Sequence, residues 1–191
     1  MKISEIKLPD VIGVTGLARS GKDTFAALSA KILSKYDKKI MKGGFAHAVK
    51  ADLHQLLVSK VGISAYTEID EEKKLIRPLL VEYGTGLMRK INKNVWVERA
   101  KPMLDLARTT KLPLFLTDVR YENEIEWIKS EGGKIVYIEQ NGIKPPNAEE
   151  RKNDPKMRKS ADFFLNWDFV GDENILKLRP KVTKILKELS C

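Results

Sequence analysis

The chain has 191 residues and carries 35 Lys and Arg against 26 Asp and Glu, which gives a formal net charge of +9. Its composition, 42% hydrophobic and 32% charged, is that of a globular domain; a disordered chain would lack the apolar surface that offsets the entropy of ordering. The basic excess favours a polyanionic partner, whether a nucleic acid, an acidic membrane surface or a phosphorylated small molecule.

Membrane proteins and disulfide-linked proteins are not expected. Residues 1–10 lack the continuous apolar segment of a signal peptide, and no run approaches the ~20 apolar residues that span a bilayer. Cys191 is the single cysteine, so neither an intramolecular disulfide nor a cysteine-based zinc site is available. His47 and His54 fit a helix face better than a metal site. We therefore expect no membrane partner and a cytoplasmic protein, in the host cytoplasm if a phage encodes it.

Short apolar runs alternate with longer segments of helical period, which is typical of an α/β fold with a mainly parallel sheet. The predicted strands are 11–15, 39–41, 114–117, 134–138 and 167–170. The predicted apolar helix stripes are Phe25, Leu28, Ile32 and Tyr36; Phe45, Val49, Leu53 and Leu56; Leu75, Leu79, Tyr83 and Leu87; and Ile175, Leu178, Val182 and Ile185. Gly132 and Gly133 are expected to end a helix that contains Ile125 and Ile128.

The segment 141–159 differs from the rest of the chain. Pro145, Pro146 and Pro155 break regular structure, which predicts a mobile loop or a small lid. Its basic residues are Arg151, Lys152, Lys156, Arg158 and Lys159. No internal repeat or linker divides the chain, so we predict one domain over residues 1–191, with the lid at about 141–160.

The segment 11–24 reads Val-Ile-Gly-Val-Thr-Gly-Leu-Ala-Arg-Ser-Gly-Lys-Asp-Thr. A predicted buried strand leads to Gly16, four residues follow, and Gly21 and Lys22 open a helix. Glycines let backbone N–H groups turn inward around a phosphate, and the lysine can reach the terminal phosphates. This is a Walker A loop in the context it requires, and it predicts ATP binding. The expected ATP-binding residues are Gly16, Arg19, Ser20, Gly21, Lys22, Asp23 and Thr24.

One position of this loop departs from the strict pattern. Asp23 stands where Ser or Thr usually contacts Mg²⁺, and the hydroxyl comes one residue later at Thr24. Many nucleoside monophosphate kinases share this feature. Asp23 could hold Mg²⁺ through water or contact a reacting group. The alternative interpretation of the loop is a glycine-rich turn that caps a structural helix.

A second element fits the first. The apolar run 114–117 ends in the carboxylate of Asp118, as a Walker B strand does, which predicts Asp118 as a further Mg²⁺ residue beside the loop. The alternative is that Asp118 only caps a turn. Arg120 and Glu124 follow on one helical face, either near the catalytic edge or as a surface ion pair.

Arginines, glycines and a tryptophan lie between the second and third predicted strands. Arginine forks suit a monophosphate, and an aromatic face can stack a base, so Arg77, Arg89 and Trp96 are candidates for binding an acceptor. Alternatively, the arginines lie on a solvated face and Trp96 belongs to the core.

Taken together, these motifs resemble the phage-type deoxynucleoside monophosphate kinases, over most of the chain up to about residue 138. The matching segments are 16–24, Phe45-Ala46 with Lys50, Arg77-Pro-Leu-Leu with Gly84-Thr-Gly, Asn94-Val-Trp-Val, 117–124 and the strand after Gly132-Gly133. The resemblance implies a three-layer P-loop kinase fold with five parallel strands, helices on both faces and a small basic lid. It also implies transfer of the γ-phosphoryl group of ATP to a deoxynucleoside monophosphate.

The resemblance also implies residue roles. Catalysis would involve Lys22, Asp23, Asp118, Arg120 and Glu124, with Thr24, Asp23 and Asp118 serving Mg²⁺ partly through water. The acceptor-binding residues would be Lys50, Arg77, Arg89, Trp96, Arg120 and Glu124, mostly on a helical insertion at about 45–110. Arg151 or Arg158 would act from the lid, and a homodimer is plausible. His47 and the segment 159–162 depart from the family pattern.

Two other functions are compatible with these residues. One is a P-loop kinase of another phosphorylated metabolite, of the dephospho-coenzyme A or phosphomevalonate type; burial of Trp96 away from an acceptor pocket would favour it. The other is a nucleic-acid-binding protein with a P-loop. No helix-turn-helix, zinc or RNP motif supports the second, and the lysines are spread along the chain, so no nucleic-acid partner is expected.

Overall fold

The structure is a computed structural model that describes residues 2–145, 148–168 and 172–190. The chain forms two compact units. The first unit comprises Met1–Gly44 and Met103–Cys191, and the second comprises Phe45–Pro102. The second unit is thus an insertion in the sequence of the first, and each is described by itself.

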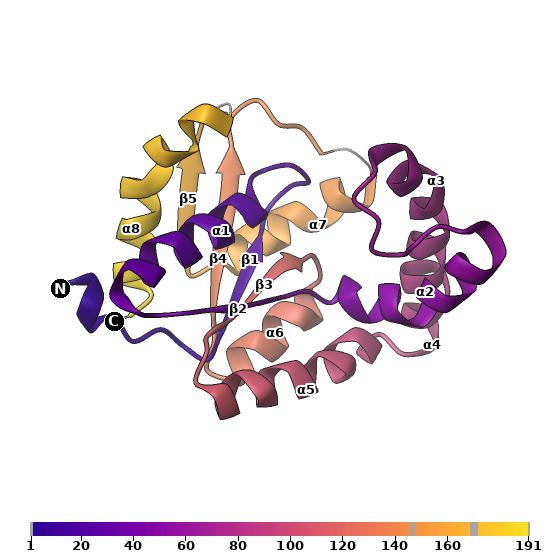
Figure 1. Ribbon diagram of the computed structural model, residues 1–191, viewed down its shortest axis with the longest axis horizontal. Helices are drawn as coiled ribbons and strands as arrows, with labels where there is room; N and C mark the ends of the chain where they lie inside the picture. Colours follow the sequence, from indigo (N-terminus) through magenta and orange to yellow (C-terminus); the bar gives the residue numbers. More distant parts are fainter. Residues whose placement is uncertain (1, 146–147, 169–171, 191) are drawn as a thin grey trace. The chain divides into compact units, whose positions relative to one another are not determined.

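The first unit contains the sheet (Figure 1). Its strands are β1 (Val11–Thr15), β2 (Met41–Gly43), β3 (Leu114–Val119), β4 (Lys134–Gln140) and β5 (Phe163–Trp167). Its helices are α1 (Lys22–Leu33), α6 (Glu122–Ser130), α7 (Ala148–Lys159) and α8 (Arg179–Glu188), with the short helices η1 (Ile3–Glu5), η2 (Ser34–Tyr36) and η4 (Asp172–Leu178). The helix α5 (Val95–Thr110) begins in the second unit and ends in the first.

All strand pairs of the sheet are parallel, in the order β2-β3-β1-β4-β5. The central strand β1 lies between β3 and β4. Strands β2 and β3 lie on one side of it and β4 and β5 on the other, so the strand order reverses at β1. In open parallel sheets, ligands bind outside the carboxyl ends of the strands at such a switch point. The segment after β1, which carries the phosphate loop motif, is at this point. The predicted fold class, an α/β protein with a five-stranded parallel sheet, is confirmed.

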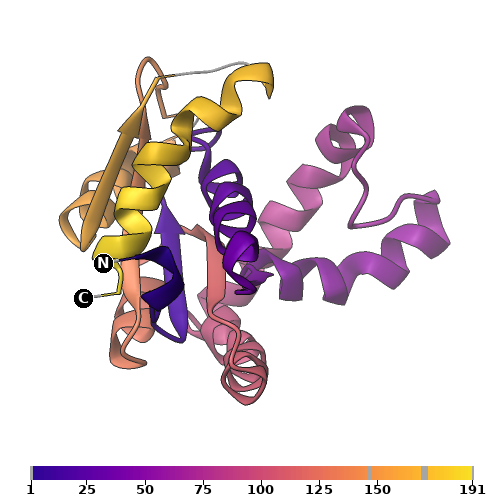
Figure 2. The same cartoon turned by 60° about the vertical axis from the view of Figure 1, so that its left-hand side comes forward.

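Apolar side chains on both faces of the sheet explain why the strands read as continuous hydrophobic runs. One face packs under α1 and α8, in a core that includes Val14, Phe25, Ile138 and Val182 (Figure 2). On the other face, Ile128 of α6 lies over Gly13, where a Cβ atom would come within 2.7 Å of the Ile128 side chain. The helices thus cover both faces and leave the carboxyl ends of the strands for the loops.

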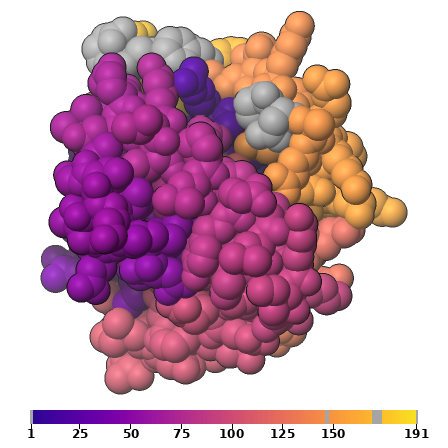
Figure 3. All heavy atoms as spheres, turned by 90° about the vertical axis from the view of Figure 1, so that its right-hand side faces the viewer, coloured from indigo at the N-terminus to yellow at the C-terminus, as the bar shows by residue number. Residues whose placement is uncertain are grey.

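The second unit is helical. It consists of α2 (Ala46–Val61), α3 (Asp70–Val81), a π-helical segment η3 (Glu82–Met88), α4 (Arg89–Ile91) and the start of α5. One buried cluster comprises Leu53, Leu57, Ala65 and Ile76. Val49, Trp96 and Val97 of this unit are also buried. Figure 3 shows the surface of this unit in purple and magenta, where many large apolar side chains are exposed.

Most strand predictions hold, with shifted ends. The strands at 11–15, 114–117 and 134–138 correspond to β1, β3 and β4, while β2 begins where the predicted strand 39–41 ends. The predicted strand 167–170 is wrong: β5 ends at Trp167, and Phe169 and Val170 lie outside the described residues. Cys191 also lies outside them. The predicted helix stop is confirmed, because Gly132 has a left-handed φ of 77°.

One predicted apolar stripe does not face a core. Leu75 and Leu79 of α3 are exposed, and so is Leu87, whereas the neighbouring Ile76 is buried. On α2, Val49, Leu53 and Leu57 are buried, whereas Leu56 is exposed. Helical period locates an apolar stripe only when one face is apolar, and in α3 leucines occupy several faces. The core face is then set by what the helix packs against.

Of the two alternatives for 141–159, the loop is wrong, because α7 occupies Ala148–Lys159 with Pro155 inside it. The small lid stays a prediction. Proline removes a backbone donor and normally weakens a helix. Here tertiary contacts outweigh that cost: Met157 is buried, and Tyr137 donates a hydrogen bond to Asp154 at 2.7 Å. Among the described residues, no helix combines the length and apolar character needed to cross a membrane.

Candidate active site

The loop between β1 and α1 has the backbone of a phosphate loop. Gly16 and Gly21 have φ values of 134° and 91°, which residues other than glycine rarely adopt. Arg19 also has a left-handed φ, of 66°. Left-handed backbone at a residue other than glycine is uncommon and concentrates at functional sites. The side chain of Arg19 is exposed, and that of Ser20 is buried with no hydrogen-bond partner for its Oγ within the described part of the chain.

Trp167 at the end of β5 supports this loop from a distant part of the sequence. Its buried indole donates a hydrogen bond from Nε1 to the carbonyl oxygen of Ser20 at 2.9 Å. The ring also packs against Gly21, where a Cβ atom would lie 2.6 Å from the Trp167 ring. The carbonyl of Ser20 is therefore held toward the indole. Position 21 requires glycine for two reasons, its left-handed φ and the close approach of the Trp167 ring.

Lys22 is 8% exposed and lies within the loop that precedes it. Its Nζ donates hydrogen bonds to the carbonyl oxygens of Gly16 (2.8 Å) and Leu17 (2.7 Å). Burial, together with the nearby positive charge of Arg120, lowers the pKa of Lys22 from 10.5 to about 8. The positive charges of Lys22 and Arg120 are therefore close enough to interact, and together they would attract an anion that carries several phosphate oxygens.

Asp23 and the Walker B strand are joined by a direct hydrogen bond. Oγ1 of Thr117 donates to Oδ1 of Asp23 at 2.7 Å, and Thr117 directly precedes Asp118. Asp118 is half-buried, and its carboxylate lies against Gly44, where a Cβ atom would come within 2.7 Å of Oδ2. The two predicted metal-binding carboxylates thus come from adjoining segments at the carboxyl edge of β3.

These oxygen donors fit Mg²⁺ bound mainly through water and substrate phosphates. Asp23, Thr24 and Asp118 are the residues that would hold the ion. No group of three or more His, Cys, Asp or Glu side chains that could hold a metal occurs within the described ranges. In phosphoryl-transfer sites, Mg²⁺ keeps several waters and takes few protein ligands.

Glu124 has a different place from the one predicted. It is 1% exposed, and its Oε2 accepts hydrogen bonds from the backbone N–H groups of Arg120 (2.7 Å) and Tyr121 (3.1 Å). It therefore caps the start of α6 and fixes the turn that carries Arg120. A buried carboxylate used in this way is a positioning group, so the predicted catalytic and acceptor-binding roles of Glu124 are withdrawn.

The Arg120 side chain is exposed and reaches α7. Its Nη1 pairs with Oε1 of Glu150 at 2.9 Å, and Oε2 of Glu150 accepts a hydrogen bond from the backbone N–H of Ala18 at 2.8 Å. The carboxylate of Glu150 thus connects the phosphate loop with Arg120. Sequence reasoning missed Glu150 because it considered only the basic residues of this segment.

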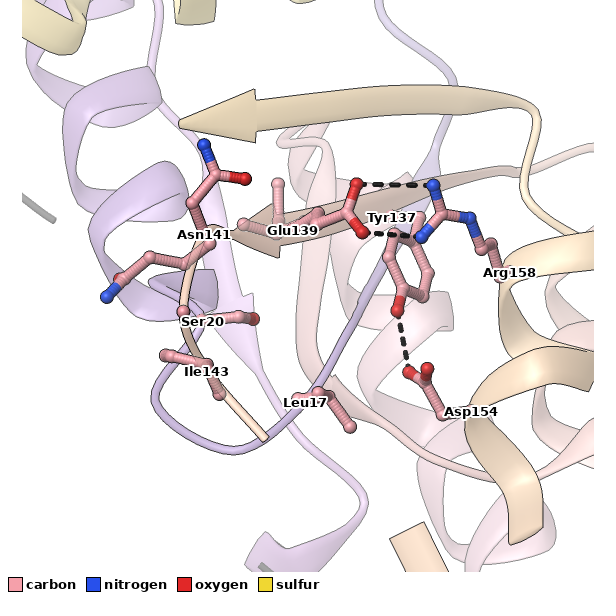
Figure 4. A pocket seen from close by; sticks show the side chains of 11 residues that line it. Leu17, Ser20, Tyr137, Glu139, Asn141, Ile143, Asp154 and Arg158 are labelled. Atoms are coloured by element: carbon pink, nitrogen blue, oxygen red, sulfur yellow. Dashed lines mark hydrogen bonds and ion pairs between the residues drawn. The ribbon is translucent and has the colours of Figure 1, made fainter. Parts of the chain in front are cut away.

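A pocket of about 170 Å³ borders the phosphate loop at the carboxyl end of β4 (Figure 4). Leu17 and Ser20 line it from the loop, and Tyr137 lines it from β4. The hydroxyl of Tyr137 donates to Asp154 of α7, and burial together with this bond raises the pKa of Tyr137. The lining of the pocket is mainly polar, with Glu139, Gln140 and Asn141 near the end of β4, while Leu17 and Ile143 supply apolar surface.

Arg158 also lines this pocket, but it is engaged in structural contacts. Its guanidinium forms two hydrogen bonds with Glu139, at 2.5 and 3.2 Å, and lies over the rings of Tyr137 and Phe164. The ion pair with Arg158 lowers the pKa of Glu139. Arg158 therefore fastens α7 to β4, which contradicts its prediction as the lid arginine, whereas Arg151 is exposed on α7.

In the second unit, Trp96 is part of the interior. It is 2% exposed, its Nε1 donates to the carbonyl oxygen of Gly84 at 3.0 Å, and its ring contacts that of Tyr83. Trp96 therefore has no free face on which a base could stack, and its predicted stacking role is contradicted. The hydrogen bond to a carbonyl of the same unit explains why this tryptophan is buried.

The predicted cations of the second unit are spread over three helices. Lys50 is half-buried on α2, with its Nζ 5.8 Å from the ring centre of Tyr66, which also contacts the imidazoles of His47 and His54. Arg77 is exposed on α3. Arg89 begins α4 and donates from Nη1 to the carbonyl oxygen of Lys93 at 3.4 Å. All three remain candidates for contacts with an acceptor.

Comparison with known proteins supports the fold. No protein-family model matches the sequence. No curated protein matches it either. The structure is similar to a dephospho-CoA kinase from Campylobacter jejuni, with a TM-score of 0.54 and 12% identity over 96% of this chain and 98% of that one. A shikimate kinase from Acinetobacter baumannii in complex with shikimate gives a TM-score of 0.43 and 14% identity, over 96% of this chain and 93% of that one.

The first of these similarities, together with the phosphate loop and the order of the parallel strands, establishes the architecture. At 12% identity it says nothing about the substrate, because one fold serves many functions. The chain has the fold of the P-loop kinases.

Proposed function

We propose that the chain is an ATP-dependent kinase that phosphorylates a phosphorylated small molecule, with a deoxynucleoside 5′-monophosphate as the acceptor. The products would be ADP and a deoxynucleoside diphosphate. The observation that carries the proposal is the hydrogen bond from Thr117 to Asp23, which joins the Walker A and Walker B segments. It brings the groups that serve the phosphates and the metal to one edge of the sheet.

The chemistry would be direct in-line transfer without a covalent enzyme intermediate. Lys22 and the loop amides would hold the β- and γ-phosphates of ATP, while Arg120 would hold the acceptor phosphate. Phosphoryl transfer depends on positioning and on neutralising charge that spreads over the phosphoryl oxygens, and Mg²⁺ bound through Asp23, Thr24 and Asp118 would contribute to that neutralisation. The acceptor phosphate is already ionised at neutral pH, so no general base is required.

The surroundings of the loop provide space for the remainder of ATP. The pocket in Figure 4 adjoins Leu17 and Ser20, and the buried hydroxyl of Ser20 forms part of its lining. We assign the nucleoside part of the donor to this pocket. Arg120 of the first unit would bind the acceptor phosphate. Lys50, Arg77 and Arg89 remain the acceptor-binding residues expected on the second unit. Of the two arginines expected to act from the lid, Arg151 is the one kept in this proposal.

A second candidate is a kinase of another phosphorylated metabolite, of the dephospho-coenzyme A or phosphomevalonate type. Burial of Trp96 favours this candidate, because a tryptophan that stacks on a base is the feature expected of a kinase for nucleotides and not of a kinase for these other metabolites. Both candidates share the donor site and differ only in the acceptor. A homodimer, a cytoplasmic location and the absence of a nucleic-acid partner remain parts of the proposal.

An ADP-release assay over a panel of acceptors decides between the candidates. The panel comprises the four common deoxynucleoside monophosphates, their ribose counterparts, dephospho-coenzyme A and phosphomevalonate. We expect turnover with one or more deoxynucleoside monophosphates. Turnover confined to dephospho-coenzyme A or phosphomevalonate would replace the first candidate with the second. If no acceptor of the panel supports ADP release, both candidates are contradicted.

The variant Arg120→Ala tests the assignment of the acceptor phosphate. Loss of this guanidinium should raise the KM of the acceptor by more than tenfold, while the KM of ATP changes less, since hydrogen bonds to charged groups contribute about 1.5–3 kcal/mol. Steady-state kinetics with each substrate varied in turn gives both constants. An equal loss for the two substrates would contradict the acceptor role.

A further inference from the structure

Glu150, on the first turn of α7, places a carboxylate on the phosphate loop. One of its oxygens accepts a hydrogen bond from the N–H of Ala18, and the other pairs with Nη1 of Arg120. The Glu150 side chain is 12% exposed, so this contact is largely shielded from water. Loop N–H groups in a Walker A motif face bound phosphate oxygens, and Arg120 is the cation proposed for the acceptor phosphate. Glu150 thus spans the donor side and the acceptor side of the site.

The charges around Glu150 are those that a phosphoryl group would meet. Arg120 is close enough to Lys22 that its positive charge disfavours the charged form of Lys22, and the Glu150 carboxylate partly offsets this effect. A carboxylate presents two anionic oxygens in one plane, as two of the three terminal oxygens of a phosphate do. It satisfies the same amide and guanidinium donors without any bound nucleotide.

We propose that Glu150 occupies the position of the γ-phosphoryl group of ATP and that ATP must displace it in order to bind. Glu150 is then an internal competitor for the γ-phosphate and lowers the affinity for ATP relative to ADP, whose phosphates do not extend to this position. Displacement would also release Arg120, so that binding of the donor prepares the cation that holds the acceptor. The inference rests on the proposed function, because it assumes that the loop binds ATP.

The remaining contacts of α7 indicate which part would move. Glu149 accepts a hydrogen bond from the hydroxyl of Tyr121 at 2.6 Å, on the same turn as Glu150. Farther along the helix, Lys156 pairs with Glu122 at 2.8 Å, and the Arg158 pair with Glu139 fastens the last turn. Release of Glu150 therefore leaves the second half of α7 anchored, and Pro155, which donates no backbone hydrogen bond, separates the two halves.

Glu149 provides a matched control for Glu150. The two residues are adjacent on α7, and both hold its first turn to the segment that carries Arg120. Glu150 bonds to the N–H of Ala18 and to the guanidinium of Arg120, whereas Glu149 bonds to the hydroxyl of Tyr121. Substitution of either residue loosens the turn, but only substitution of Glu150 removes the proposed competing anion.

The test is to measure the affinities of the full chain for ATP and ADP by calorimetry without an acceptor, for the native protein and for E150Q, E150A and E149Q. In both Glu150 variants we expect ATP to bind about tenfold tighter, which corresponds to about 1.4 kcal/mol, while ADP changes less than twofold. E149Q should leave both affinities within twofold. Thermal unfolding of each variant confirms that it is folded.

Three results would overturn the inference. Unchanged or weaker ATP binding in the folded Glu150 variants would show that Glu150 supports the loop. An equal gain for ATP and ADP would place the carboxylate away from the γ-phosphate. An equal gain in E149Q would assign the effect to loosening of α7. None of these readouts involves phosphoryl transfer. A lack of turnover with every acceptor would therefore contradict the proposed function, whereas the ATP and ADP affinities would still test the role of Glu150.

Discussion

The two units of this chain use their side chains in different ways. In the first unit, residues far apart in sequence meet at the carboxyl edge of the sheet: Trp167 bonds to Ser20, Thr117 to Asp23, and Glu150 to Ala18. In the second unit, many large apolar residues, such as Leu75 and Ile91, are exposed on the helices. A site held by many distant contacts is preorganised, whereas exposed helix faces can vary with less effect on packing.

This difference suggests a division of roles. The donor chemistry, which is the same for every acceptor, would be fixed by the rigid edge of the sheet. The acceptor would be selected by the second unit, through Lys50, Arg77 and Arg89. The following experiments test this division.

The largest expected effect is the loss of activity on substitution of Lys22. Lys22→Ala removes the cation proposed to hold the β- and γ-phosphates, so kcat/KM for ATP should fall by about 10²–10³-fold. The ADP-release assay measures this loss. Lys31→Ala is the control, because Lys31 lies exposed on the same helix. Unchanged turnover in a folded Lys22→Ala protein would remove the first unit from the chemistry.

The next effect concerns the core of the second unit. Ile76→Ala removes a buried side chain and should lower the free energy of unfolding by about 2–4 kcal/mol. Leu75→Ala, one residue earlier and 69% exposed, should change it by less than about 0.5 kcal/mol. Urea denaturation of both variants measures the difference. Equal losses would mean that the face of α3 bearing Leu75 is buried in solution.

Lys22 also predicts a pH dependence of stability. Its pKa is 10.5 in the unfolded reference and about 8 in the folded chain, so between these values the unfolded chain binds more protons. The contribution of Lys22 to the free energy of unfolding should therefore rise with pH across this window, by up to about 1.4 kcal/mol per pH unit. The stability of the native protein relative to Lys22→Met, measured from pH 7 to 10, should increase. A constant difference would contradict the lowered pKa.

The smallest expected effect tests the remote support of the loop. Trp167→Phe keeps a ring against Gly21 but removes the donor to the Ser20 carbonyl, so ADP affinity should fall about fivefold, since a neutral hydrogen bond contributes about 1 kcal/mol. Trp96→Phe is the matched variant, because its indole also donates to a backbone carbonyl, but within the second unit. Calorimetry should show unchanged ADP affinity for Trp96→Phe. Equal effects of the two substitutions would contradict a specific role for Trp167.

Local patterns were sufficient for much of the first unit. The strand, the glycines and the lysine of the phosphate loop stand together in the sequence, so β1 and the start of α1 could be predicted directly. Asp118 followed from an apolar strand that ends in a carboxylate. In each case the residues that define the feature lie within a few positions of one another, and one backbone geometry accommodates them.

Patterns failed where the outcome depended on a distant partner. Pro155 suggested a loop, but burial of Met157 and the Asp154 and Arg158 contacts stabilise a helix there. Arg158 resembled a mobile cation and is instead paired with Glu139. Glu124 and Trp96 looked like substrate residues and are buried, because each satisfies backbone groups that a single sequence does not reveal.

The sequence by itself determined the basic character of the chain, its alternation of strands and helices, and the phosphate loop with Lys22 and Asp23. Those features depend on composition and short-range spacing, which are independent of how the chain packs. Only the tertiary structure decided which carboxylate meets the loop amide, which tryptophan supports the loop and which face of α3 is exposed. These outcomes arise from contacts between residues tens to more than a hundred positions apart, such as Ala18 with Glu150 and Ser20 with Trp167. The net charge of +9 indicated an anionic partner, and the structure placed Lys22 and Arg120, two of the cations suited to it, around a single carboxylate.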